Sequence, residues 1–298
     1  MKKLMLLIGI CMIQLTADAQ MLAREILKQK TENDLKEIIN SSSSLTGLMA
    51  IDLTSGETIG VNSDIIFTQA SAIKIPILME VYKQAHEKKF ALTDIKPLLP
   101  SNTVAGSGIL NTMTDPVNLS IRNYCMLMIG LSDNSATNTL IGLVGMANVT
   151  NTMHSLGFTN TRLQRKMIDQ PASLRNEENI STPADAANIL KFLFDGKFID
   201  AATSNELLSI LQKNPIENSK IASGVPANIK IAFKPGGMGG VSTEWAIVYL
   251  KNRPYAIAIM ENYKTSATPD SIISSLSKRV FDYYSMMKAT KYGVLLEN

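Results

Sequence analysis

The chain has 298 residues, of which 45% are hydrophobic and 18% are charged, and its formal net charge at pH 7 is +3. This is the composition of an ordinary globular protein, long enough for one large core or for two lobes. So small a charge excess gives no reason to expect nucleic acid or an anionic membrane as a partner.

Residues 1–19 have the pattern of a secretory signal peptide. Lys2 and Lys3 precede an apolar run over 4–15, and small residues then allow cleavage after Ala19. The apolar run is too short to span a bilayer, and Cys11 within it does not follow a small residue, so neither a membrane anchor nor a lipoprotein is expected. We therefore predict a periplasmic or secreted protein that is monomeric and has no membrane anchor after cleavage.

Helical and strand patterns alternate along the rest of the chain. Apolar spacing predicts an amphipathic helix over 23–39, followed by two strands on either side of a tight turn at 54–56. From Ser71 to about Leu211 the signals are mainly helical. Strand-like segments follow at 228–236, 243–250 and 254–260, with a turn at 251–254, and helical periodicity returns over 270–289.

Strands therefore lie near both ends of the chain and helices fill its middle. The simplest arrangement is an α/β (α+β) fold, in which a sheet built from both ends is covered by the terminal helices. We expect one discontinuous lobe from 20–68 and 215–298, and a helical lobe from 69–214. Two lobes imply a cleft between them.

A lysine within an apolar run is the first candidate for chemistry. In "FTQASAIKIPILMEV", Lys74 lies between two isoleucines, three residues after Ser71. If a helix starts at Ser71, the two side chains share a face, and the lysine could activate the serine as a nucleophile. Lowering a lysine pKa from about 10.4 to about 7 costs on the order of 4 to 5 kcal/mol. Apolar surroundings and a second nearby cation both lower the pKa in this way. The same spacing at Ser275/Lys278 and Ser285/Lys288 shows that the pair alone is a weak signal.

Histidine and cysteine offer less. Of the two histidines, His86 is expected to be an exposed helix residue and His154 has no acidic neighbour in sequence, so nothing local supports a Ser-His-Asp arrangement. Cys125 would be the only cysteine after cleavage, so no intramolecular disulfide can form. Cys/His zinc sites are excluded by count, and no calcium-loop spacing is present. We expect no metal and no cofactor.

Two further motifs strengthen the case for Ser71 and Lys74. Ser132-Asp133-Asn134 follows an apolar helical run in "MLMIGLSDNSATNTLI", and Lys234-Pro235-Gly236-Gly237 follows a strand-like run in "IAFKPGGMGG". Each motif taken alone could have a purely structural role. The first could be a helix N-cap, and the second could be the end of a strand before a loop. In this order, the three motifs match the Ser-x-x-Lys, Ser-Asp-Asn and Lys-Thr-Gly signature of class A β-lactamases and penicillin-binding proteins. The sequence resembles the class A serine β-lactamase family over almost the whole exported chain.

The resemblance implies a fold, a substrate and a role for each matching residue. It implies an antiparallel sheet with flanking helices, a helical lobe, an active site in the cleft and a small-molecule β-lactam as substrate. Ser71 would be the nucleophile, Lys74 would accept its proton, and Ser132 would relay a proton to the departing lactam nitrogen. Asn134 would bind the substrate amide. Lys234 would attract its carboxylate, and the backbone N–H groups of Ser71 and Gly237 would form the oxyanion hole.

The sequence departs from the family in two places. The family has a glutamate two residues after an arginine, which activates the water that hydrolyses the acyl-enzyme. Here Arg165 is followed by Lys166 and Met167, and a thioether cannot act as that base. The nearest acid, Asp169, is expected to be a surface or capping residue. Pro235 replaces a Thr or Ser whose hydroxyl binds the substrate carboxylate, and Ser242 or Thr243 could compensate.

We therefore expect an exported serine β-lactamase that forms an acyl-enzyme on Ser71 and deacylates slowly or in an atypical way. Two alternatives remain open. One is a D,D-peptidase or penicillin-binding-type acyl hydrolase with the same Ser71, Lys74 and Ser132. The other is a β-lactam-binding sensor with little turnover, although intact catalytic residues argue against complete loss of activity.

Overall fold

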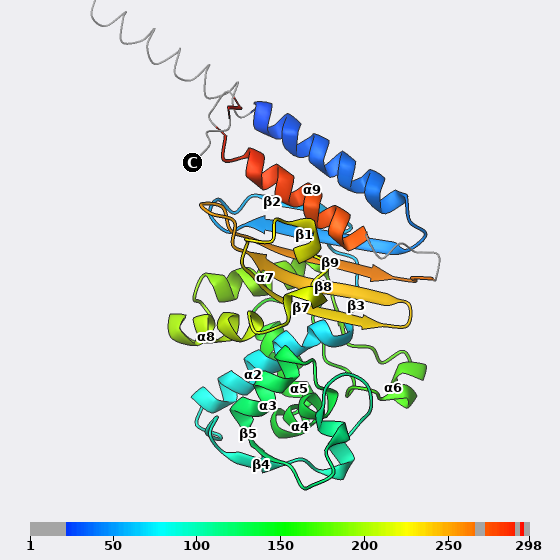
Figure 1. Ribbon diagram of the computed structural model, residues 1–298, viewed down its shortest axis with the longest axis vertical. Coiled ribbons are helices and arrows are strands. Elements are labelled where there is room, and N and C mark those ends of the chain that lie inside the picture. The colour runs from blue at the N-terminus through cyan, green and yellow to red at the C-terminus, as the bar shows by residue number, and fades with distance from the viewer. Residues whose placement is uncertain (1–21, 266–271, 290–292, 295–298) are drawn as a thin grey trace, which may run out of the picture.

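The structure is a computed structural model that describes residues 22–265, 272–289 and 293–294 (Figure 1). Its centre is a five-stranded antiparallel sheet in the order β2-β1-β9-β8-β7. Strands from the two ends of the chain therefore pair directly. The sheet strands are β1 (Leu45–Asp52), β2 (Thr58–Val61), β7 (Ile231–Met238), β8 (Val241–Val248) and β9 (Tyr255–Asn262).

Both faces of this sheet are apolar and buried. Successive side chains of a strand point to opposite faces. On β8, Trp245 and Ile247 accordingly join one hydrophobic core, and Ala246 and Val248 join another. The sheet thus needs a layer of helices on each side.

Two helices cover one face of the sheet. The helix over 22–40 and α9 (Ile272–Met286) lie side by side above it in Figure 1, in blue and red. Leu35 and Tyr283 are fully buried in the core beneath them. An ion pair of 2.8 Å between Arg279 Nε and Asp34 Oδ2 joins the two helices. It is partly exposed, so apolar packing provides most of the attachment.

The other face of the sheet carries α7 (Pro183–Phe194), which packs on β9, β1 and β8. Thr182 caps this helix by accepting a hydrogen bond from the Asp185 N–H at 3.1 Å, and Pro183 occupies its first position. The other helices are α2 (Lys74–His86), α3 (Ile121–Gly130), α4 (Asn134–Val144), α5 (Met146–Ser155), α6 (Gln170–Leu174) and α8 (Ala201–Leu211). Short strand pairs join β3 (Phe67–Thr68) to β6 (Ile180–Ser181) and β4 (Ile95–Pro97) to β5 (Asn118–Ser120).

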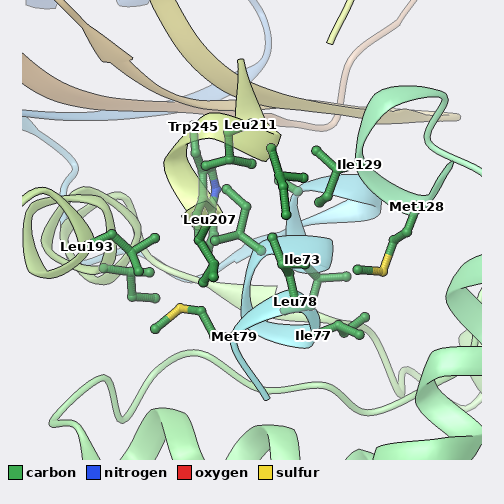
Figure 2. Close-up of a cluster of buried hydrophobic side chains, with 14 of the residues drawn as sticks. Ile73, Ile77, Leu78, Met79, Met128, Ile129, Leu193, Leu207, Leu211 and Trp245 are labelled. Atoms are coloured by element: carbon green, nitrogen blue, oxygen red, sulfur yellow. The ribbon is translucent and has the colours of Figure 1, made fainter. Parts of the chain in front are cut away.

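Helix α2 is the central element of the helical part. Figure 2 shows its apolar side chains within a cluster that α3, α7, α8 and β8 also supply. This enclosure leaves Lys74, at the start of α2, without exposed surface. The labelled members of the cluster are Ile73, Ile77, Leu78, Met79, Met128, Ile129, Leu193, Leu207, Leu211 and Trp245.

The α+β fold class predicted from the sequence is confirmed. The terminal helices, the early hairpin and the three late strands form within a few residues of their predicted bounds. The signal segment and its Cys11 lie outside the described residues, and the division into lobes at 69 and 214 stays a prediction. Within the part of the chain that is described, no helix is long and apolar enough to cross a membrane.

Gly224, in the 3₁₀ turn η5 (Ala222–Gly224), sits directly against α9. A Cβ added there would lie 2.7 Å from Lys278 N and closer still to Ser274 O. We expect Gly224→Ala to lower the free energy of unfolding by about 1–3 kcal/mol, because neither the backbone of η5 nor that of α9 can move easily to make room for the added methyl group. Thermal unfolding followed by circular dichroism measures the loss.

The matched control is Gly239→Ala, in the turn between β7 and β8, where an added Cβ would meet nothing within 4 Å. Its unfolding free energy should stay within about 0.5 kcal/mol of the parent value. Equal stability of the two variants would show that the contact between η5 and α9 is not close.

Candidate active site

A cleft of about 740 Å³ opens beside β7, the edge strand of the sheet. Residues from several regions line it, among them the turn before α2, the segment between α3 and α4, the segment over 214–220, and strands β7 and β8. Four of the six predicted site residues line it directly, namely Ser71, Ser132, Lys234 and Gly237. Lys74 and Asn134 lie immediately behind them, in hydrogen-bond contact with Ser132 or with each other.

Ser71 lies in a 3₁₀ turn, η1 (Ala70–Ile73), directly before α2. The preceding Ala70 has a φ of 42°, an uncommon value for a residue with a side chain. Strand β7 passes so close to this turn that a Cβ on Gly236 would lie 2.8 Å from Ser71 N and 2.6 Å from Gln69 O. The nucleophile candidate is therefore fixed against the edge strand.

Gln69, which the sequence analysis did not single out, anchors the same turn. Its side chain is fully buried, and its Nε2 donates to Phe67 O at 2.8 Å. Its Oε1 accepts from Trp245 Nε1 at 2.9 Å, which ties the turn to β8. A buried amide with partners on both ends rigidifies its surroundings.

Lys74 is the first residue of α2 and is completely buried. Its Nζ donates to Ser132 O at 2.7 Å, Ser132 Oγ at 3.1 Å and Asn134 Oδ1 at 3.0 Å. A lysine ammonium has three donors, and these three acceptors use all of them. Burial lowers the pKa of Lys74 well below its usual value, and the charge of Lys234 lowers it further, whereas Asp133 opposes the shift.

The expected hydrogen bond from Lys74 to Ser71 is not among the contacts of the described residues. Lys74 starts the α-helix while Ser71 lies in the 3₁₀ turn before it, and the lysine's three donors already have acceptors on the segment that leads into α4. The lysine reaches the cleft chiefly through Ser132. A neutral amine would need fewer acceptors and could then turn to Ser71.

Ser132 is the point where the two lysines meet. Its Oγ accepts from Lys74 Nζ and from Lys234 Nζ, each at 3.1 Å. Its φ of 53° turns the backbone before α4 and brings its carbonyl oxygen to Lys74 as well. Since both lysines donate into this oxygen, its own proton is left to point elsewhere.

Asp133 and Asn134 hold this arrangement in place. Asp133 caps α4 by accepting from Ala136 N at 2.8 Å, and its other oxygen accepts from Ile109 N at 2.7 Å. The helix-cap interpretation of the motif and the catalytic one are therefore compatible. Asn134 uses Oδ1 for Lys74 and donates through Nδ2 to Ala105 O at 3.3 Å.

Lys234 is fully buried on β7 and donates to Pro235 O at 3.0 Å as well as to Ser132. Burial lowers its pKa to about 7, and the charge of Glu244 on β8 opposes that shift. Gly237 lines the cleft two positions after Pro235, and a Cβ there would meet only Val241 O, at 3.9 Å.

The outer part of the cleft contains Ser242 and Thr243, the two hydroxyl residues expected to compensate for Pro235, together with a cation that the motifs did not reveal, Lys220. Lys220 Nζ donates to Ser242 Oγ at 3.0 Å, and both residues line the cleft. Thr243 also lines it, and its hydroxyl donates to Gln69 Oε1 at 3.5 Å. In the sheet Ser242 pairs with Gly237, two positions after the Pro235 that lacks the family's hydroxyl.

The segment around Met167 supplies no carboxylate to the cleft. Met167 is buried, and its N–H donates to Asn138 Oδ1 at 2.8 Å while its carbonyl accepts from Asn138 Nδ2. Asp169 caps α6 by accepting from Ala172 N at 3.1 Å. Glu178 pairs with Arg165 at 2.8 Å. Of the described residues that line the cleft, Glu244 alone is an acid.

The remaining candidates lie elsewhere. His86 and His154 are exposed residues of α2 and α5, and neither lines the cleft. Cys125 is buried in α3 as a free thiol, and burial raises its pKa to about 12. The described residues contain no group of three or more His, Cys, Asp or Glu arranged to hold a metal ion.

A serine and two buried lysines thus meet at one cleft of an α+β fold, and comparisons with known proteins show which family has this fold. A model of the beta-lactamase enzyme family matches residues 30–284, so the chain belongs to that family. Beta-lactamase SME-1 of Serratia marcescens is 27% identical over 75% of this chain and 77% of its own length. Beta-lactamase AST-1 of Nocardia asteroides is 25% identical over 82% of this chain and 80% of its own length.

Solved structures show the same fold. A beta-lactamase from Sphaerobacter thermophilus superposes with a TM-score of 0.79 at 28% identity, covering 86% of this chain and 97% of that one. The resemblance to class A serine β-lactamases stated from the motifs is thereby confirmed at the level of the family.

Gly236 offers a direct test of how closely β7 approaches Ser71. We expect Gly236→Ala to slow acylation of Ser71 by about tenfold or more, because its Cβ would push the strand away from the nucleophile's turn by contacts costing about 1–3 kcal/mol. The acylation rate with a fluorescent penicillin is the measurement. Gly239→Ala, whose Cβ would meet nothing within 4 Å, is the control and should stay within about threefold of the parent rate. Similar losses in both variants would contradict the geometry.

Proposed function

We propose that the protein is an exported serine β-lactamase that opens β-lactams through an acyl-enzyme on Ser71 and releases the product slowly. The observation that carries this proposal is the Ser132 hydroxyl held between two buried lysines, 3.1 Å from each, in a cleft that Ser71 also lines. Membership of the beta-lactamase enzyme family supports it.

In the acylation step, Ser71 Oγ attacks the lactam carbonyl carbon and Lys74 takes the serine proton. Burial and the charge of Lys234 both favour the neutral form of Lys74, which the step requires. The carbonyl oxygen becomes an oxyanion that the N–H groups of Ser71 and Gly237 would stabilise, a contribution of about 10² to 10³ in rate per donor. Gly236 between them keeps the two segments close.

Ser132 then completes the proton transfer. Because Lys74 and Lys234 both donate to its oxygen, its own proton can pass to the lactam nitrogen as the C–N bond breaks. Lys74 returns its extra proton to Ser132, and the net result is an ester on Ser71 and a ring-opened amine. Asn134 would orient the substrate's side-chain amide next to this centre.

The substrate carboxylate would bind at the outer end of the cleft. Lys234 supplies charge there, and Lys220 with the Ser242 hydroxyl would replace the hydroxyl that Pro235 lacks. An ammonium and a hydroxyl that already contact each other are preorganised for one carboxylate.

Deacylation is expected to be the slow half of the reaction. It needs a base that activates water, and two residues after Arg165, at the position where the resemblance places the family's glutamate, this chain has Met167. Such a base typically contributes about 10² to 10⁴ in rate. The acids near Met167 are used otherwise, Asp169 as a helix cap and Glu178 as the partner of Arg165.

A penicillin-binding-type D,D-peptidase would use the same acylation machinery, and a sensor would simply retain the adduct. The two alternatives differ from a β-lactamase in the fate of the acyl-enzyme. The experiment that separates them follows the acyl-enzyme directly.

Intact-protein mass spectrometry after mixing with a penicillin or a cephalosporin should show an adduct that clears slowly as hydrolysed product accumulates. Ser71→Ala should form none, and Asp169→Asn should clear at the parent rate because Asp169 caps a helix. The unreacted exported protein should have the mass of a chain that lacks residues 1–19.

Each other outcome has a definite meaning. A permanent adduct would indicate a penicillin-binding protein or sensor, and fast clearing would show that another group activates water. Slower clearing in Asp169→Asn would make Asp169 that group. Neither adduct nor product would contradict the proposal and direct the search to peptide and ester substrates.

The carboxylate site can be tested through Lys220. We expect Lys220→Met to raise the apparent KM for an anionic β-lactam about tenfold with kcat little changed, because the contact forms on binding and persists in the transition state. Steady-state kinetics measures both constants. Lys251→Met, in the exposed turn between β8 and β9, removes the same charge far from the cleft lining and should leave KM unchanged. Equal effects of the two variants would mean that only the overall charge matters.

A further inference from the structure

Glu244 is a buried carboxylate that the reaction scheme does not use. It lies on β8 with 1% of its surface exposed, at the position paired with Pro235 of β7. It also contributes to the lining of the cleft. A buried acid beside an active site is costly unless its charge is stabilised, so its partners indicate its role.

The partners of Glu244 all come from one short segment. Its Oε2 accepts from Lys220 N at 2.9 Å and from Ile221 N at 3.2 Å, and its Oε1 accepts from the Ser219 hydroxyl. The same segment is fixed on its far side, where Ser277 Oγ of α9 donates to Ile221 O at 2.8 Å. Glu244 thus clamps the backbone that carries Lys220 into the cleft.

Glu244 also lies close to Lys234 in the sheet, because it pairs with Pro235, the residue of β7 directly after Lys234, and its charge acts on that lysine. Burial raises the pKa of Glu244 to about 7, and its negative charge raises the pKa of Lys234 against the effect of burial. Lys234 has no carboxylate within 4 Å among the described residues, so this longer-range interaction favours its charged form. A neutral Lys234 would lose its attraction for an anionic substrate.

The other charged groups around this pair are few. Lys74 of α2 and Asp133 at the start of α4 lie on the Lys234 side. Lys220 lies beside Glu244, and Glu261 of β9 shares its sheet face, with Lys264 Nζ at 3.7 Å from Glu261 Oε2. Glu244 is the acid whose charge supports Lys234.

We propose that Glu244 is a positioning residue that acts through two lysines: it keeps Lys234 charged against Ser132 and holds the backbone of Lys220 at the outer end of the cleft. This inference rests on the proposed function, in which both lysines receive the substrate carboxylate. The oxygens of Glu244 accept from Ser219, Lys220 and Ile221, so its role is to position the two lysines.

The charge and the clamp can be separated by Glu244→Gln. The glutamine oxygen can accept from the N–H groups of Lys220 and Ile221. In the parent protein the Ser219 hydroxyl donates to Glu244, and in the variant the glutamine NH₂ group can donate to Ser219 Oγ instead. Only the charge is then lost. The pKa of Lys234 should fall, so this lysine loses its proton at a lower pH than in the parent protein.

The first measurement needs no substrate. A pH titration of protein carrying ¹³C-labelled lysine, followed by NMR, gives the pKa of Lys234, with its signal assigned by its loss in Lys234→Arg. A lower pKa in Glu244→Gln is expected, and an unchanged pKa overturns the proposal. Since no β-lactam is present, this result stands even if the protein proves not to be acylated.

The second measurement is the rate of acylation by an anionic penicillin between pH 6 and pH 8. Relative to the parent protein, Glu244→Gln should lose on the order of tenfold more rate at pH 8 than at pH 6, the equivalent of about one pKa unit. Gly224→Ala disturbs the clamped segment through α9 but keeps the charge, so its loss should be the same at every pH.

Glu244→Asp keeps the charge and should restore the parent pH profile even if the overall rate is lower. It also provides a second variant should Glu244→Gln fold poorly. A pH-independent loss in Glu244→Gln, equal to that of Gly224→Ala, would mean that Glu244 is merely structural and would refute its action on Lys234.

Discussion

The site depends on the burial of two lysines without a carboxylate at contact distance. Lys74 and Lys234 expose none of their surface, and among the described residues neither forms an ion pair within 4 Å. Their ammonium groups are satisfied by neutral oxygens, chiefly those of Ser132. Desolvation and mutual repulsion therefore act together to make at least one proton easy to lose. A buried lysine with a lowered pKa is a candidate base that needs no histidine.

The rest of the fold keeps this costly arrangement in place. α2 is enclosed by apolar side chains from three helices and from β8 (Figure 2), and Lys74 at its start is fully buried. Asp133 fixes the start of α4, and Gln69 fixes the turn of Ser71 to Trp245. Each of these polar groups is buried and hydrogen-bonded, so none adds an unpaired charge to the site.

Sequence patterns predicted the parts of this structure that depend on local order. Periodicity located the terminal helices and the sheet strands, and three short motifs identified Ser71, Ser132 and Lys234 as neighbours in a cleft. The roles of Gln69, Lys220 and Glu244 could not be predicted, because each depends on a contact between segments far apart in the chain. The spacing of Ser71 and Lys74 suggested a direct contact, but three acceptors on and near Ser132 compete for the ammonium.

The two halves of the proposed reaction are supported by different parts of the molecule. Acylation requires Ser71, the lysines and Ser132, all of which are held by buried contacts between the sheet and the helices around α2. Deacylation requires a base from the segment around Met167, whose acids instead cap a helix or pair with Arg165. The Asn138 side chain binds both the N–H and the carbonyl oxygen of Met167, so the backbone of this segment is held in place by an amide and needs no carboxylate for that purpose. On the proposed function, the chain keeps the fold and the acylation centre and lacks the group that makes turnover fast.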